Sequence, residues 1–192
     1  YGFGLDEAGN YAHSEDVSRE AAVLEPYGYW PHHAVSHVLE MTGRPADGLK
    51  WMEERRAFWS AKDNASRVHI WWHKALFHVE LGDFEAAMAI YDGPVLANQR
   101  PIGISLTNAT ALLWRLEMLG FDAGERWQTL AKIWDGHADG RLCLFADIHA
   151  AMTATRAGDG VALGRLRAAM ARTASETSEA AHAYRAIGLP LV

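Results

Sequence analysis

The sequence is poor in cysteine and in positive charge, and it has no long apolar run. Its one cysteine, Cys143, has no partner for an internal disulfide, which is typical of reducing compartments, so we expect a cytoplasmic protein. Lysine and arginine number 18 against 24 acidic residues, giving a formal net charge of -6. This balance gives no electrostatic basis for binding nucleic acid or an anionic membrane. No apolar run approaches the roughly 20 residues that a membrane-spanning helix needs.

Common catalytic motifs are also missing. The sequence has no GxxxxGK[ST] phosphate loop and no GxSxG nucleophile elbow. Cys143 lies six residues before His149, on a different helix face, so we interpret it as a small core residue rather than a nucleophile. The 192 residues are 49% hydrophobic and 22% charged, which is typical of a soluble folded protein. The sequence therefore defines no enzyme class and no cofactor.

Glycines recur in matching contexts, 34 to 39 residues apart. Each follows one helical pattern and precedes another, and glycine ends helices well because it accepts the left-handed conformation without strain. Such a period is typical of helix-turn-helix repeats. We therefore predict an all-α fold: one domain over residues 1–192, an α-solenoid of helix-turn-helix repeats forming a right-handed superhelix. The repeated glycines are Gly9, Gly43, Gly82, Gly120 and Gly158.

The stretch IWWHKALFHVELGDFEAAMAIYD, residues 70–92, illustrates one repeat. Its apolar residues follow the helical period on both sides of the glycine, and Gly93 with Pro94 ends the second helix. We expect Trp71 and His78 to pack between these two helices. Other helix pairs are predicted around residues 30–59, 103–134 and 142–172, with a last helix near 176–187 and a loop from Gly93 to Pro101.

Residues of this repeat resemble a known family. Gly82, Phe84, Ala87 and Tyr91, with Trp71 eleven places before the glycine, resemble a tetratricopeptide repeat. Over nearly the whole chain, the sequence resembles the tetratricopeptide repeat protein 38 family in the segments HHAVSHVLEMTGR, WWHKALFHVELGDFEAAMAIYD, GERWQ, LFADIHAAM and IGLPL. The resemblance implies the repeat fold but no settled activity. It also implies a longer protein, in agreement with a chain that starts at Tyr1.

The first helix of each repeat is expected to line a concave groove. The groove positions assigned from the repeat register contain no lysine or arginine. Tetratricopeptide domains that bind carboxylate tails use basic side chains at such positions. An aromatic groove suits a hydrophobic protein segment, so we predict a binding or scaffold module for a protein or peptide partner, with a homodimer as an alternative. The parent protein's own helices are another occupant. The predicted groove residues are Trp30, His33, His37, His69, Trp72, His73, Thr110, Trp114, Asp147 and His149.

Two histidine pairs suggest a second hypothesis. His33 and His37 are four residues apart, as are His69 and His73, so each pair shares a helix face. Pairs on adjacent hairpins that converge could hold zinc, with a carboxylate completing the shell. The HAVSH segment lacks the glutamate of the metalloprotease signature. Metal binding, an enzyme or small-molecule site that includes Asp147 and His149, and simple hydrogen bonding between histidines all stay open.

Overall fold

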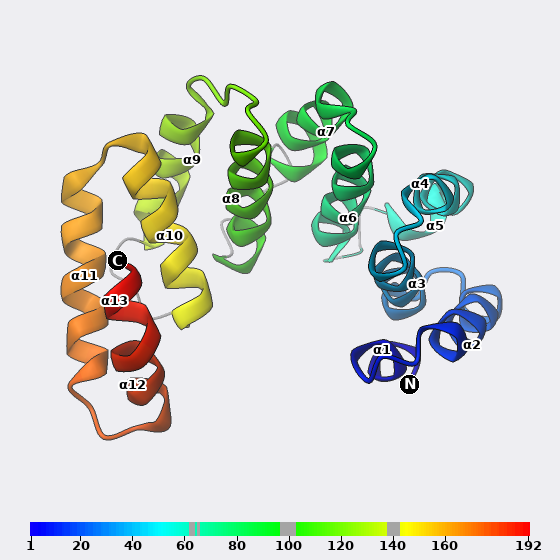
Figure 1. The fold of residues 1–192 in the computed structure, drawn as a ribbon, viewed down its shortest axis with the longest axis horizontal. Helices are drawn as coiled ribbons and strands as arrows, with labels where there is room; N and C mark the ends of the chain where they lie inside the picture. The colour runs from blue at the N-terminus through cyan, green and yellow to red at the C-terminus, as the bar shows by residue number, and fades with distance from the viewer. Residues whose placement is uncertain (62–63, 65, 97–102, 138–142) are drawn as a thin grey trace. The chain divides into compact units, whose positions relative to one another are not determined.

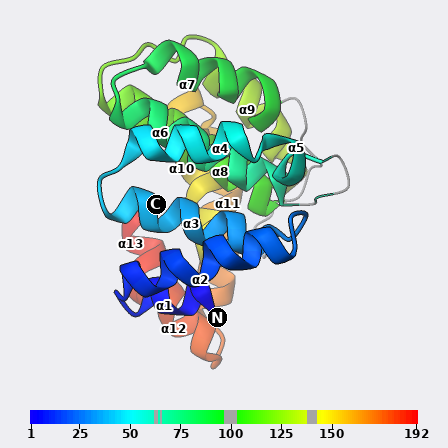
Figure 2. The same cartoon turned by 90° about the vertical axis from the view of Figure 1, so that its right-hand side faces the viewer.

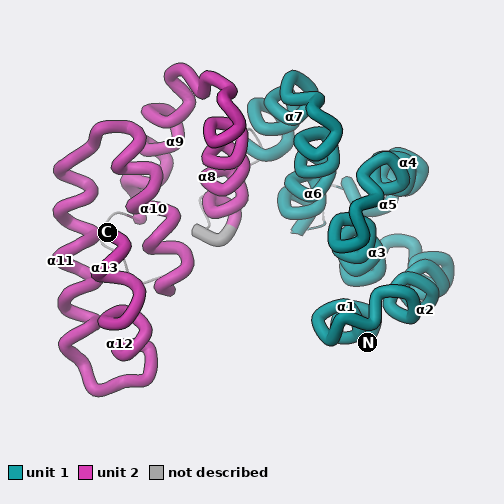
Figure 3. The backbone as a smooth tube through the Cα atoms, viewed as in Figure 1, with its two compact units in different colours: residues 1–98 teal, residues 99–192 magenta. Residues whose placement is uncertain are grey.

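The computed structural model describes residues 1–61, 64, 66–96, 103–137 and 143–192, and every regular element in these ranges is helical (Figure 1). The prediction of an all-α fold is confirmed at this level. Within the same ranges, no helix has both the length and the apolar character needed to cross a membrane. The chain divides into two compact units, Tyr1–Asn98 and Gln99–Val192 (Figure 3).

Unit 1 consists of helices joined mostly by short turns. Its elements are α1 (Gly2–Glu7), α2 (Tyr11–Leu24), α3 (Tyr29–Met41), α4 (Pro45–Glu54), α5 (Arg56–Trp59), α6 (Arg67–Glu80), α7 (Phe84–Ile90) and a π-helical turn, η1 (Tyr91–Val95). α1 packs on α2 and α3, and α3 packs on α4 and α6 (Figure 2). The packing of α3 on α6 sets the two histidine pairs beside each other.

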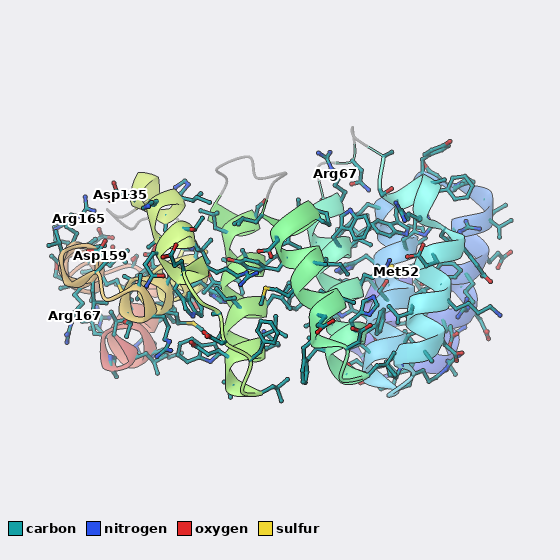
Figure 4. All side chains as sticks on the ribbon, turned by 90° about the horizontal axis from the view of Figure 1, so that it is seen from above. Met52, Arg67, Asp135, Asp159, Arg165 and Arg167 are labelled. Carbon is teal, nitrogen blue, oxygen red and sulfur yellow. The ribbon has the colours of Figure 1, made fainter. Side chains whose placement is uncertain are left out.

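Unit 2 has the same kind of architecture. Its elements are α8 (Gly103–Met118), α9 (Arg126–Trp134), η2 (Asp135–His137), α10 (Leu144–Ala157), α11 (Gly160–Ala174), α12 (Glu179–Ala183), η3 (Tyr184–Gly188) and α13 (Leu189–Leu191). α10 packs on α8, α9 and α11. Arg165 of α11 forms an ion pair with Asp135 at the end of α9, and the two labels lie close together in Figure 4. The ion pair joins neighbouring helices of this unit.

Left-handed glycines end the first helix of each predicted pair. Gly43, between α3 and α4, has φ of +65°, and Gly82, between α6 and α7, has φ of +75°. Residues with a Cβ rarely adopt this conformation, so glycine lets the chain reverse there. Gly9, Gly120 and Gly158 are also left-handed, and each of the five turns joins helices that pack on each other. The predicted glycine turns are therefore confirmed.

The second helices begin with recognisable caps. The Asp83 side chain accepts a hydrogen bond from the Ala86 amide at 3.1 Å at the start of α7. Asp159, labelled in Figure 4, does the same for the Ala162 amide at 2.9 Å at the start of α11. Each carboxylate binds an amide that the first helical turn leaves without a partner. Pro45 starts α4 at a position where no amide hydrogen is needed.

A buried core fixes α6 against α3 and α4. Met52, labelled in Figure 4, and Phe77 are both fully buried in it. Gly48 lies against the Phe77 ring: a Cβ built on the glycine would be 2.5 Å from Cζ of Phe77. The glycine therefore allows α4 to approach α6 closely, and this holds α6 in register beside α3.

Two local predictions need correction. Cys143 is exposed and stands at the start of α10, so its interpretation as a core residue is wrong. The predicted loop from Gly93 to Pro101 begins inside η1, where Gly93 departs from helical geometry with φ of -87° and ψ of -106°. The remainder of that loop, from residue 97, lies outside the described residues.

Candidate metal centre

Four histidines converge in unit 1. His33 and His37 lie on α3, and His69 and His73 lie on α6. Each offers one ring nitrogen, and these four nitrogens all lie within 4.8 Å of one another. A separation of four residues on a helix directs both members of a pair to one face, and the contact between α3 and α6 brings the two faces together. We call this group the four-histidine cluster.

The closest contacts in the cluster join Nε2 atoms. Nε2 of His33 lies 3.1 Å from Nε2 of His37 and 3.1 Å from Nε2 of His69. Nε2 of His69 also lies 3.2 Å from Nε2 of His73. The two central nitrogens, those of His33 and His69, therefore each have two close nitrogen neighbours.

Protons alone do not satisfy these contacts. An imidazole Nε2 has one in-plane position, which holds either a hydrogen or a lone pair, so it takes part in one good hydrogen bond. His33 and His69 each face two Nε2 neighbours, and hydrogen bonds therefore account for at most two of the three close contacts. His37 and His73 carry their hydrogens on Nδ1, toward Asp6 and Glu40, so both end nitrogens of the chain present lone pairs. With neutral rings, one contact is then left with two lone pairs or two hydrogens face to face. A cation at the centre removes this conflict because it accepts a lone pair from every ring.

The nitrogen spacing fits such a cation. Zinc binds imidazole nitrogen at about 2.0–2.1 Å, so four nitrogens around one tetrahedral ion lie roughly 3.3 Å apart. The three closest separations in the cluster are 3.1, 3.1 and 3.2 Å. Four imidazoles suit Zn²⁺ and related divalent transition metals. They do not suit Ca²⁺ or Mg²⁺, which take oxygen ligands.

Burial keeps these imidazoles in the neutral form that binds metal. Burial, together with the neighbouring His73, His37 and His69 in the same direction, lowers the pKa of His33 to about 2. The pKa of His73 is well below its ordinary value, again chiefly because the ring is buried. Burial also lowers the pKa of His37, against the opposing charge of Glu40. Protons therefore compete weakly with a metal ion for these nitrogens at neutral pH.

Two carboxylates contact the outer nitrogens, Nδ1, of two of the four rings. Nδ1 of His73 lies 3.1 Å from Oε2 of Glu40, and Nδ1 of His37 lies 3.5 Å from Oδ2 of Asp6. An ionised carboxylate only accepts hydrogen bonds, so the hydrogen of each ring is placed on Nδ1 and the Nε2 lone pair faces the cluster. This is the arrangement that orients histidine ligands in metal sites. The expected carboxylate thus stands outside the ligand shell, and a fourth imidazole takes its place.

Aromatic rings surround the cluster. Tyr29 stacks on His33 at 5.0 Å between ring centroids, and Phe3 lies 5.0 Å from the same ring. Trp72 stacks on His69 at 5.4 Å with an interplanar angle of 12°. Trp30 packs on His33 at 5.6 Å while staying 61% exposed. The apolar rings limit access of water and strengthen electrostatic interactions inside.

The predicted groove residues of unit 2 have separate partners within that unit. Thr110 is fully buried, and its hydroxyl lies 2.9 Å from that of a second threonine, Thr153. Asp147 is also buried and accepts a hydrogen bond from the Tyr184 hydroxyl at 2.7 Å.

The remaining two predicted residues of unit 2 are half-buried. Trp114 meets the edge of Trp127, with 6.4 Å between ring centroids, and His149 donates to the carbonyl of Phe145 at 2.7 Å. The four-histidine cluster is complete within unit 1 without any of these residues.

Sequence reasoning missed Asp6, Glu40 and Phe3. Glu40 gave a weak signal, since it follows His37 by three residues and lies near the same helix face. Asp6 and Phe3 come from a separate short helix and share no spacing with the histidines, so only the packing of α1 on α3 reveals them.

The fold and this cluster define a helical protein with a candidate four-histidine metal centre. No protein-family model matches the chain, and no solved structure matches it.

Proposed function

We propose that unit 1 binds one divalent transition-metal ion, most simply Zn²⁺, through Nε2 of His33, His37, His69 and His73. The observation that carries this proposal is the chain of three Nε2 contacts at 3.1–3.2 Å, which neutral rings do not satisfy when His37 and His73 carry their hydrogens on Nδ1 toward the carboxylates. The metal-binding alternative raised by the histidine spacing is thus preferred to simple hydrogen bonding between the rings.

A site with four protein ligands has a structural or sensing role rather than a catalytic one. Catalytic zinc sites keep one position open for water or substrate, whereas structural sites use four protein ligands. Here two ligands come from each of two neighbouring helices, so the ion joins α3 to α6. The free energy of metal binding then contributes to the folding of unit 1.

The first test is the metal content of protein purified without a histidine tag, followed by zinc titration against a chelating indicator. We expect one zinc ion per chain in the wild type and none in His33→Ala/His73→Ala. The matched control, His149→Ala/His182→Ala, removes two histidines from unit 2 and should bind zinc as the wild type does.

A second variant separates loss of the site from loss of the fold. His69→Gln changes a half-buried ligand and keeps a polar side chain of similar length. We expect its helical circular dichroism to match that of metal-free wild type while zinc affinity falls about 100-fold or more, since one of four ligands is lost. Zinc binding that survives both sets of substitutions, or a wild type that binds no zinc, rejects the proposal.

A tetratricopeptide-type binding or scaffold module is the second candidate function. It is supported by the left-handed glycines at 34 to 39 residue intervals, each joining two packed helices, and by the exposed Trp30 beside the cluster. In this proposal the hairpins form a tetratricopeptide-like solenoid that binds a protein or peptide partner in the cytoplasm. Crosslinking of the wild type and of Trp30→Ala to partner proteins tests this proposal. A partner that both proteins retain equally argues against the aromatic surface around Trp30 as the binding site.

A further inference from the structure

The charge of the proposed site requires compensation. Four neutral imidazoles around a divalent ion carry a net charge of +2, and a buried net charge is costly unless it is paired. Asp6 and Glu40 stand at the outer nitrogens of two of the four rings and supply two negative charges. The ion, its ligands and these two carboxylates together form a neutral group.

The two carboxylates differ in where they come from. Glu40 lies on α3, the helix that already carries two of the ligands, and its side chain is 29% exposed. Asp6 lies on α1, which carries no ligand, and it is only 5% exposed. Its Oδ1 is buried and has no hydrogen-bond partner among the described residues, while Oδ2 faces Nδ1 of His37 at 3.5 Å.

Contacts with α2 and α3 hold the α1 helix in place. It spans six residues, too few for a stable helix on its own. The Phe3 ring packs on His33 and His37, with 5.0 and 5.2 Å between ring centroids. The hydroxyl of Ser14 on α2 donates to the carbonyl of Gly2 at 2.7 Å. Two of these contacts, those of Phe3 and Asp6, are made directly to metal ligands.

We propose that Asp6 is a positioning residue through which metal occupancy holds α1 against α3, and this inference rests on the proposed function. An ion on Nε2 of His37 withdraws electron density from the ring and makes Nδ1–H a stronger donor to the carboxylate. The same positive charge compensates the buried carboxylate. Removal of the ion leaves Asp6 facing a neutral ring, and α1 then loses the charge attraction that holds Asp6 to the cluster.

Hydrogen–deuterium exchange of the full chain tests the link between zinc and α1. Exchange of the α1 amides is compared with saturating zinc and with a chelator, and α11 of unit 2 serves as the internal reference. We expect zinc to slow α1 exchange by about tenfold or more in the wild type. The control Glu7→Gln changes the exposed neighbour of Asp6 on the same helix and should respond as the wild type does.

The decisive variant is Asp6→Asn, which keeps the shape of the side chain and removes its charge. It should still bind one zinc ion, with affinity reduced about 10–100-fold, and saturating zinc should no longer slow α1 exchange. Its Co²⁺ complex should keep the visible spectrum of the wild-type Co²⁺ complex, because all four ligands remain.

Three results overturn the inference, and they are distinguishable. If the wild type binds one zinc ion but α1 exchange does not change, the link is wrong and the metal site stands. If Asp6→Asn retains the full effect of zinc on α1, Asp6 is not the residue responsible. If the wild type binds no zinc, the proposed function fails and this inference fails with it.

Discussion

Acidification of the metal-free protein should destabilise unit 1, because the four-histidine cluster holds its rings neutral. The pKa of His33 falls from an ordinary value of 6.5 to about 2 in the folded protein. Between these values the unfolded chain binds a proton that the folded protein excludes. The contribution of neutral His33 to the stability of the folded protein is therefore complete above pH 6.5, and it is lost progressively as the pH falls from 6.5 towards 2.

The magnitude follows from the same two values. A pH of 5 lies 1.5 units below the pKa of 6.5 that His33 has in the unfolded chain. Each unit corresponds to about 1.4 kcal/mol, so His33 alone lowers the free energy of unfolding by about 2 kcal/mol at pH 5. His73 and His37 act in the same direction, since burial lowers their pKa values too. Asp6 opposes them, because burial raises its pKa. A loss of about 2 kcal/mol is large against the usual 5–15 kcal/mol of domain stability.

Urea unfolding at pH 7.5 and pH 5, with a chelator present, measures this loss. His33→Gln has no ring to titrate at that position, so its stability should fall by about 2 kcal/mol less than that of the wild type. The exposed His182→Ala should behave as the wild type does. Equal unfolding free energies of the wild type at the two pH values, or an equal loss in His33→Gln, would refute the reasoning.

Four further substitutions test individual contacts. Gly48→Ala should destabilise by about 1–3 kcal/mol in urea unfolding, despite the higher helix propensity of alanine, because its Cβ meets the Phe77 ring; a stabilised variant would contradict this. Tyr184→Phe removes a buried hydroxyl that donates to a carboxylate and should cost about 1–3 kcal/mol in unit 2, with zinc affinity unchanged in the indicator titration. Trp71→Ala should cost about 3 kcal/mol in thermal unfolding and leave zinc affinity intact, since Trp71 packs on the core. Trp72→Ala should cost less stability and weaken zinc binding; equal losses of stability in the two tryptophan variants would overturn this division.

The sequence was informative wherever structure depends on neighbouring residues. The positive φ of Gly43 and Gly82 and the shared face of His33 and His37 depend on a few adjacent positions, and all were predicted. The outer carboxylate of Asp6 was not, because it lies on another helix and its place depends on how α1 packs.

The predicted groove register was harder to derive in unit 2. Thr110 was placed at a groove position from the repeat offset, and Asp147 was grouped with the groove histidines. Both are buried with partners inside their unit. Their helices, α8 and α10, pack on each other, and the glycine spacing here exceeds 34 residues. A repeat offset assigns a face to each residue but does not say what a neighbouring helix covers.

The placement of the histidines on two successive hairpins has a consequence for the unfolded chain. His33 and His69 are 36 residues apart, so an ion bound to both closes a loop that contains all of α4 and α5. A covalent link closing a loop of that length reduces the entropy of the unfolded chain by an amount worth about 4 kcal/mol. A chain with only Cys143 has no disulfide to supply such a link. A histidine-bound ion would act as a reversible staple, strong when metal is plentiful and absent when it is scarce.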